Sequence, residues 1–392
     1  MKLLMITGLG SARDLVSGKK GAFYNTLDEF HKYWERIDII SPGVSRNSTL
    51  KNLEIESLFG NVYIHISPWP LMFHPFWFLK KGLEIYKEQK FDLMTVHEFP
   101  PFYNGIGARL LWNKIKVPYI LEIHHIPGYP RAAGAKEKIY KNLMRVFIKF
   151  DAKKAKAVRV VNQDQTPKFL IESGVPREKI IYIPSLYIDL EIFKPMNLPK
   201  EYDLIFIGRL EKNKGLDLLL EAFQILNTKY LIHNLRLLIV GDGPERKNLE
   251  FLFRQSFSRQ ANIKDNEFKK NVIMRGYVKD QREIAELINK SKILVMPSYN
   301  EGGPRVVVEA MACGVPVLAT SVGIVPDIIK FKSGGAIQII DWKAEDIAKK
   351  AFELLHDRDK NQMYILAGFK IAYQFEKKAM IQNYADKLKG LC

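Results

Sequence analysis

The sequence predicts an α/β protein of two domains, each a doubly wound sheet of parallel strands with helices on both faces. Three times an apolar run leads into a glycine turn and then into a helical stretch, beginning at residues 2, 203 and 235. The chain has 392 residues, of which 47% are hydrophobic and 26% charged, so it can bury two domain cores. In such sheets the carboxyl ends of the strands form the edge where ligands bind.

Charge and cysteine content narrow the class of protein. The formal net charge is +17, and an excess of basic residues suits a nucleic acid, an anionic membrane or a phosphorylated substrate. Cys313 and Cys392 are too few for a disulfide framework, which favours a reducing compartment. The opening residues MKLLMITGLG form a strand that enters a glycine turn, not a signal peptide. We therefore expect a cytoplasmic protein.

The first predicted strand covers residues 2–7, and a glycine-containing loop separates it from a helix over residues 22–34. Gly8-x-Gly10 begins like a dinucleotide fingerprint, but Arg13 stands where the third glycine is required. This departure argues against a nicotinamide cofactor. The loop ends at Gly21, directly before the helix.

Two further predicted strands, residues 92–97 and 119–124, each end in a histidine. Because parallel strands share one carboxyl edge, we expect His97 and His124 to lie at the same edge of the first sheet. A lone histidine is more often structural than functional, and we expect His97 to have a structural role.

Residues 131–159 carry ten basic and two acidic side chains. Apolar residues recur within them at helical spacing and predict a surface helix that packs on the first sheet with its basic face outward. These apolar residues are Ile139, Leu143, Val146, Phe147 and Phe150.

The second predicted domain opens with a strand over residues 203–207 and the turn Gly208-Arg209-Leu-Glu-Lys-Asn-Lys214-Gly215. Fixed Arg and Lys side chains at such a turn can stabilise the negative charge that a departing diphosphate gains. The alternative is that both are solvated residues of an ordinary turn. Further on, Gly276, Tyr277 and Val278 follow a short strand and form either a ligand contact or an ordinary βα loop.

The most informative stretch is residues 297–320, PSYNEGGPRVVVEAMACGVPVLAT. It predicts a loop between the strand 293–296 and a helix 306–312, which Gly314 ends before the strand 315–319. Two carboxylates, Glu301 in the loop and Glu309 on the helix, can hold two sets of hydroxyl groups on one ligand. The alternative is a capped helix with a solvated Glu309.

The run E-G-G-P-R-V-V-V-E resembles the Glu-x7-Glu signature of the family-four retaining glycosyltransferases, and the Arg209–Lys214 turn is similar to that family's phosphate turn. The resemblance implies the GT-B fold, two Rossmann-like domains that face each other across a cleft. The first domain is expected over residues 1–190 and the nucleotide-sugar domain over 191–365. A C-terminal helix over 366–392 is expected to cross back to the first domain.

The resemblance also implies the chemistry. We expect a retaining, metal-independent transferase, without cofactor, that moves a sugar from a nucleotide-diphospho-sugar to a glycan or lipid-linked acceptor in cell-envelope glycan synthesis. Arg209 and Lys214 would hold the diphosphate, Glu309 the ribose and Glu301 the sugar hydroxyls, with His124 near the reacting carbon. The implied donor-binding residues are Gly21, Gly208, Gly276, Tyr277, Val278, Gly302, Gly303, Pro304, Arg305, Val306 and Glu309.

Other functions stay open at this point. A sugar-nucleotide epimerase or a phosphorylase can share the GT-B fold, since a fold does not fix a function. A nucleic-acid-binding protein is permitted by the charge, but no binding motif supports it, and we expect no nucleic-acid partner.

Residues 69–79, WPLMFHPFWFL, are followed by Lys80 and Lys81. The run is too short to span a bilayer, but if exposed it suits peripheral contact with an anionic membrane. If it is buried, it is part of the first domain's core.

Overall fold

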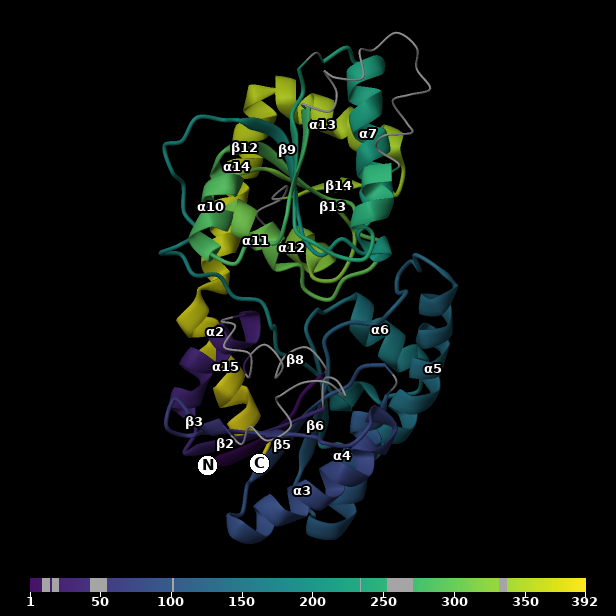
Figure 1. Ribbon diagram of the computed structural model, residues 1–392, viewed down its shortest axis with the longest axis vertical. Helices are drawn as coiled ribbons and strands as arrows, with labels where there is room; N and C mark the ends of the chain where they lie inside the picture. The colour runs from purple at the N-terminus through teal and green to yellow at the C-terminus, as the bar shows by residue number, and fades with distance from the viewer. Residues whose placement is uncertain are drawn as a thin grey trace. The chain divides into compact units, whose positions relative to one another are not determined.

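The computed structural model describes residues 1–8, 15, 21–42, 55–100, 102–232, 234–251, 271–330 and 337–392 (Figure 1). Residues 1–126, 139–185 and 378–392 form one compact unit, and residues 127–138 and 186–377 form the other. Most of the first glycine loop, with Gly10 and Gly18, lies outside the described residues, and so does most of the basic segment 251–271.

The first unit contains an eight-stranded sheet in which every neighbouring pair is parallel except β3 and β4. Its strands, in spatial order, are β3 (Ile55–Leu58), β4 (Val62–Ile66), β2 (Arg36–Ser41), β1 (Lys2–Ile6), β5 (Leu93–His97), β6 (Tyr119–Ile123), β7 (Ala157–Val160) and β8 (Ile180–Tyr182). Its helical segments are α2 (Ala22–Phe30), η1 (His31–Tyr33), η3 (Leu71–Phe73), α3 (His74–Glu88), α4 (Tyr103–Ile115), α6 (Gln165–Glu172) and η4 (Arg177–Lys179).

The second unit is a six-stranded sheet, parallel throughout. In spatial order its strands are β11 (Val272–Arg275), β10 (Leu237–Val240), β9 (Tyr202–Ile207), β12 (Ser291–Met296), β13 (Val317–Thr320) and β14 (Gln338–Ile340). The chain order reverses between β9 and β12, and ligands bind at such a switch point in open α/β sheets.

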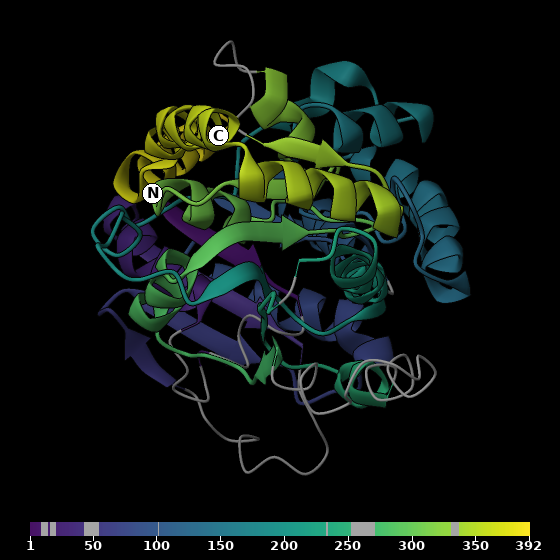
Figure 2. The same ribbon diagram turned by 90° about the horizontal axis from the view of Figure 1, so that it is seen from above.

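The strands of this second sheet are nearly continuous apolar runs, so both faces of the sheet must be buried, and helices cover them. α7 (Leu216–Thr228) and α13 (Ala344–His356) share one buried cluster with the sheet, and α11 (Arg305–Ala312) packs with α14 (Arg358–Ala372) (Figures 1 and 2). The remaining helical segments of this unit are η5 (Lys212–Lys214), α10 (Gln281–Asn289), α12 (Val325–Lys330) and η6 (Tyr373–Phe375). The prediction of doubly wound α/β domains is confirmed.

Helix α11 ends as its sequence predicts. Gly314 has φ +71°, a left-handed conformation that glycine adopts without strain, and its N–H donates to the carbonyl of Met311 at 3.1 Å. The next N–H, from Val315, donates to the carbonyl of Ala310 at 2.9 Å. The helix begins at Arg305, one residue before the predicted start, and Pro304 directly precedes it.

The last helix, α15 (Lys377–Lys389), lies almost entirely in the first unit, as the resemblance implied. Its buried Tyr384 donates a hydrogen bond of 2.6 Å to the Glu122 carboxylate of β6, and its ring stacks on Phe30. The same carboxylate oxygen accepts from the Arg159 guanidinium of β7 at 2.6 Å. A buried polar network therefore attaches the end of the chain to the first sheet.

Helix α5 (Ala135–Ala152) departs from the prediction. Ile139, Leu143, Val146 and Phe150, expected against the sheet, are between 41% and 70% exposed. Of the predicted stripe, Phe147 stacks on Phe102, and the Arg109 guanidinium lies 3.8 Å from the centroid of the Phe150 ring. The helix has a second apolar face, and it is this face that is buried, through Met144, Ile148 and Ala152. Hydrophobic spacing alone could not choose between two such faces.

The aromatic run at residues 69–79 divides between surface and core. Trp69, Met72, Phe73 and Phe76 are 39–64% exposed, whereas the second half, with Trp77 and Phe78, is buried. Within the described part of the chain, no helix is both long and apolar enough to cross a membrane.

A pair of buried carboxyl groups lies beneath the start of α4. A side chain at Gly105 would place its first carbon 2.5 Å from both the Glu98 Oε2 and the Asp151 Oδ2 atoms, so these oxygens are at most about 5 Å apart. Neither Asp151 oxygen has a hydrogen-bond donor among the described residues. Burial raises the pKa of Asp151 to about 7, and burial together with Asp151 raises that of Glu98.

We expect Asp151→Asn to stabilise the protein at alkaline pH. The pKa of Asp151 is raised in the folded state, so wild-type stability falls as pH rises from the unfolded value, about 4, through about 7. The amide needs no ionisation, and the gain should be roughly 4 kcal/mol at pH 8 and small at pH 4. Urea unfolding at both pH values measures it, and an equal effect at the two would contradict the assignment.

Candidate active site

An ion pair between Lys214 and Glu301 forms the centre of the candidate site. The Lys214 ammonium contacts Glu301 Oε1 directly, and the Ser298 hydroxyl donates to the same oxygen at 3.1 Å. The two side chains are only 13% and 17% exposed. The sequence predicts that both residues belong to the site, but it does not predict that they pair.

Two glycines hold the loop of Glu301 against its neighbours. Gly215 has φ +65°, and a side chain there would collide with the carbonyl of Pro297. Gly323 has φ +58°, and a side chain there would collide with the carbonyl of Gly302. Only glycine permits both the backbone angle and the close approach, so the loops after β9, β12 and β13 are packed into one rigid layer.

Polar residues that sequence analysis missed complete this layer. Asn300 is fully buried, and its amide donates to the Arg131 carbonyl at 2.8 Å and to Glu137 Oε2 at 2.9 Å. The Ser298 carbonyl accepts from Thr320 at 2.6 Å and from the Trp342 indole at 2.9 Å. Asn300 stands next to Glu301 in the sequence, but the segment that it contacts, residues 127–138, is distant along the chain.

The remaining residues of the phosphate turn are more open. Arg209 is 75% exposed at its side chain and pairs with Glu211 at 2.9 Å. Gly208 donates its N–H to the Val240 carbonyl at 3.0 Å, which fixes the start of the turn. Arg209 can therefore move toward a ligand, whereas Lys214 is already held in place.

Glu309 lies on α11 and is 8% exposed. Burial raises its pKa to about 7, although Arg305, one helical turn earlier, acts in the opposite direction. The Arg305 guanidinium lies 4.4 Å from the centroid of the Tyr187 ring, and this contact holds the Arg305 side chain at the start of α11. The carboxyl group of Glu309 is buried, not solvated as the alternative interpretation required.

The other predicted donor contacts occupy the same edge of the sheet. Gly276, Tyr277 and Val278 directly follow β11, and the Gly276 carbonyl accepts from Gly241 at 3.2 Å. Tyr277 is 71% exposed. The backbone from Gly302 to Arg305 forms the approach to α11, with Val306 inside its first turn.

In the first unit, His97 and His124 lie together at the carboxyl edge, as the sequence predicted. Their rings stack at 4.4 Å between centroids. Burial lowers the pKa of both, and for His124 the neighbouring His97 lowers it further, so both rings are neutral at pH 7. Gly21 stands directly before α2.

The fold and these loops define a class of protein first. It is a two-domain α/β protein in which charged residues gather at the carboxyl ends of parallel strands. Among the residues that the structure describes, no group of His, Cys, Asp and Glu side chains is arranged to hold a metal ion.

Comparison with known proteins gives the family. Residues 189–371 match the family described as "Glycosyl transferases group 1". MJ1059, an uncharacterized glycosyltransferase of Methanocaldococcus jannaschii, is 30% identical over 325 residues, which cover 78% of this chain and 73% of that protein. The chain belongs to the group 1 glycosyltransferases.

Two further proteins are similar over long stretches. A Campylobacter jejuni α-1,4-N-acetyl-D-galactosaminyltransferase, named for an acceptor on PP-undecaprenol, is 29% identical over 290 residues, 73% of this chain and 70% of that enzyme. The crystal structure of Anabaena HepE in complex with UDP is similar with a TM-score of 0.74 and 18% identity over 100% of both chains. The fold is therefore GT-B.

Proposed function

We propose that this protein is a retaining, metal-independent glycosyltransferase that uses a nucleotide-diphospho-sugar and acts in cell-envelope glycan synthesis. The observation that carries the proposal is the Lys214–Glu301 pair, two nearly buried charges at the switch point of the second sheet. Two relatives support the ligand classes: HepE binds UDP, and the Campylobacter enzyme is named for an acceptor on PP-undecaprenol. The acceptor proposed here is likewise a glycan or a lipid-linked glycan.

The ligand would separate the pair. Lys214, with Arg209 closing in, binds the diphosphate, and the freed Glu301 carboxylate accepts hydrogen bonds from sugar hydroxyls. The backbone N–H groups from Gly302 to Arg305, at the start of α11, add partial positive charge beside the ligand. Binding thus replaces one ion pair by two sets of charge-assisted bonds.

In the reaction, the bond between the anomeric carbon and the phosphate oxygen breaks, and a bond to the acceptor oxygen forms on the same face. The acceptor proton passes to the departing diphosphate, so no separate general base is needed. Lys214 and Arg209 stabilise the charge that the leaving group gains. His124, neutral, would donate a hydrogen bond to the sugar, and Gly21 would leave room for the diphosphate.

The decisive experiment follows the anomeric configuration of the product by NMR, with and without EDTA. The proposal expects the configuration of the donor to be kept and the rate to survive chelation. Inversion, or strict dependence on magnesium or manganese, would overturn it. A thermal-shift screen with uridine, guanosine, adenosine and thymidine diphosphates identifies the base, because a ligand at 100 times its Kd adds about 2.7 kcal/mol.

We expect binding of the nucleotide-sugar to strengthen as pH rises through about 7. Ribose hydroxyls donate to an ionised Glu309, whereas free Glu309, with its pKa raised to about 7, must first lose a proton. Affinity should be about tenfold weaker at pH 6 than at pH 8. Calorimetry with a nucleotide-sugar avoids the terminal phosphate of a free diphosphate, which itself titrates near pH 6. Glu309→Gln should remove the pH dependence, and a flat wild-type profile would contradict this role.

We also propose that the first unit contacts an anionic membrane. Two exposed apolar surfaces support it: the aromatic patch of Trp69, Met72, Phe73 and Phe76, and the exposed stripe of α5. Exposed cations accompany both, Lys80 beside the patch and Arg145 and Lys149 along the helix. Apolar side chains next to lysine and arginine are typical of surfaces that bind acidic lipids.

Trp69→Ser/Phe76→Ser and Leu143→Ser/Val146→Ser should each reduce co-sedimentation with phosphatidylglycerol vesicles severalfold, and Lys80→Glu/Lys81→Glu should do so most at low salt. The control is Tyr373→Ser, which removes an exposed aromatic ring from the second unit. Trp77 is buried and is left unchanged. Absence of binding by the wild type at low salt, or equal binding by all variants, would contradict membrane contact.

A further inference from the structure

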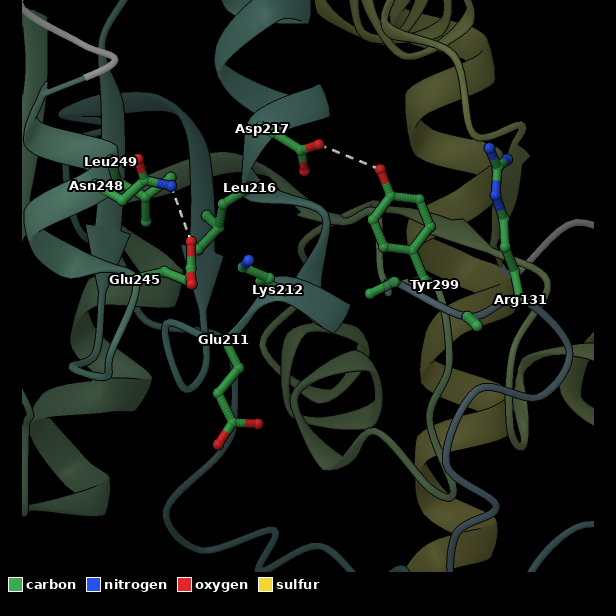
Figure 3. A pocket seen from close by; sticks show the side chains of 11 residues that line it. Arg131, Glu211, Lys212, Leu216, Asp217, Glu245, Asn248, Leu249 and Tyr299 are labelled. Atoms are coloured by element: carbon green, nitrogen blue, oxygen red, sulfur yellow. Dashed lines mark hydrogen bonds between the residues drawn. The ribbon is translucent and has the colours of Figure 1, made fainter. Parts of the chain in front are cut away.

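A pocket of about 440 Å³ lies in the second unit beside the candidate site (Figure 3). Its polar lining comes from loops and helix starts: Arg131, Glu211, Lys212, Asp217, Glu245, Asn248 and Tyr299. The lining residues do not include any described residue that is assigned above to binding of the sugar donor. The turn from Gly208 to Gly215 and the loop of Glu301 thus each contribute residues both to the candidate site and to the pocket.

The lining is suited to a neutral ligand with many hydroxyl groups. Tyr299 donates to Asp217 at 3.2 Å, and Asn248 donates to Glu245 at 2.9 Å, so each carboxylate is oriented and keeps a second oxygen (Figure 3). Lys212 appears between Glu245 and Tyr299 in Figure 3 and supplies a donor. Carboxylates, an amide and an ammonium around a ring edge can bond hydroxyls from several directions.

The same lining disfavours the other ligand classes. The lining carries three carboxylates, Glu211, Asp217 and Glu245, against two cations, Lys212 and Arg131, so a phosphorylated or otherwise anionic molecule gains no net attraction there. An apolar ligand would have to desolvate all of these charged groups without replacing their hydrogen bonds. Leu216, Leu249 and Ala133 add apolar surface, of the kind that a sugar ring's C–H groups can cover.

The wall of the pocket is fixed before any ligand binds. Residues 131–133 form one side of it, and the buried Asn300 holds them through the Arg131 carbonyl. Glu137 accepts from the Ala133 N–H at 2.7 Å, and the Arg131 guanidinium lies 5.3 Å from the Tyr299 ring centroid. Groups held in place lose little freedom on binding, which favours recognition of weakly bound sugars.

Sequence spacing places the pocket next to Lys214 and Glu301, the central residues of the candidate site. Tyr299 is two residues before Glu301, and Lys212 is two residues before Lys214. Two residues of extended chain span at most about 7 Å, close to the size of one sugar ring. We propose that the pocket binds the inner sugars of the acceptor, so that the preferred acceptor is a glycan of at least two rings. This inference rests on the proposed transferase function.

Saturation-transfer NMR tests the pocket directly, with the trisaccharides maltotriose, cellotriose and chitotriose and with their monosaccharides as probes. We expect at least one trisaccharide to bind at least tenfold tighter than its monosaccharide. Ala133→Trp, which fills the pocket, should abolish this binding, and Asp217→Asn/Glu245→Gln should weaken it at least tenfold. Lys349→Ala, an exposed change on α13, is the matched control and should have no effect.

Thermal shift with the nucleoside diphosphate runs in parallel, and a normal shift shows that each pocket variant is folded. If no trisaccharide binds to the wild type, or if binding survives both the Ala133→Trp and the Asp217→Asn/Glu245→Gln changes, the inference is wrong. Lys214→Ala should lose nucleotide binding and keep trisaccharide binding. Trisaccharide binding without any nucleotide binding would count against the proposed function and leave the pocket assignment standing.

Discussion

Lys214→Ala is expected to lower the turnover of sugar transfer by about 10²- to 10³-fold. Removing one preorganised group that stabilises transition-state charge costs about 2.7–4 kcal/mol. Lys214 meets this condition because its ammonium is nearly buried and already held by Glu301. Arg209 is exposed and must move to the ligand, so Arg209→Ala should cost less.

The free enzyme adds a second effect. Without Lys214, the Glu301 carboxylate is left in a nearly buried position with only Ser298 as a donor from the described contacts. A partly buried charge without its partner is costly, and a diphosphate would then approach a bare carboxylate. Nucleotide affinity should therefore fall together with turnover in Lys214→Ala.

Glu301→Gln separates the two effects. It removes the negative charge but keeps the shape, so nucleotide binding should be retained while turnover falls. Steady-state kinetics for kcat and KM, with calorimetry for nucleoside diphosphate binding, measure both, and Lys349→Ala serves as the control. More than a tenth of wild-type turnover in Lys214→Ala would rule out this lysine as the main stabiliser of the leaving group.

Local sequence pattern predicted the parts of this site that depend on neighbours in the chain. The positions of Lys214 and Glu301 follow from glycine turns at strand ends, and Gly314 ends its helix as expected. The pairing of these two charges depends on β9 and β12 being adjacent in the sheet, which periodicity does not reveal. The family resemblance gave their roles but not their contact.

The features that sequence analysis missed depend on distant segments. Residues 127–138 belong to the second unit and are held by Asn300, so the pocket wall could not be inferred from either segment alone. Helix α5 has two apolar faces, and the choice between them was made by the core around Met144 and Ile148. The buried pair of Glu98 and Asp151 likewise comes from two elements far apart in sequence.

Arg159→Met is expected to destabilise the first unit by about 3–5 kcal/mol at pH 7, because it leaves a buried carboxylate without its cation. Glu122 is 4% exposed and Arg159 2% exposed. Burial alone would raise the pKa of Glu122, but Arg159, His124 and the Tyr384 hydroxyl together lower it to about 2. Arg159 also donates to the carbonyls of Ile183 and Pro184, each at 3.1 Å.

The sign of the pH dependence distinguishes this network from simple packing. A lowered pKa for Glu122 gives stability that is present above about pH 4.5 and is lost as pH falls toward 2. In Arg159→Met the carboxyl group should become protonated at higher pH. The cost of the substitution should therefore be largest near neutral pH and shrink as the solution becomes acidic.

Urea unfolding of a small set of variants at pH 7 and pH 5 measures these effects. Adding Glu122→Gln to Arg159→Met should recover most of the lost stability, since no buried charge then remains. Tyr384→Phe should cost about 1.5–3 kcal/mol, the value of a hydrogen bond to a charged group, and should loosen α15 from the first sheet. If Arg159→Met unfolds at the wild-type urea concentration, or if Glu122→Gln fails to rescue it, the network does not hold the terminal helix and packing around Phe30 must do so.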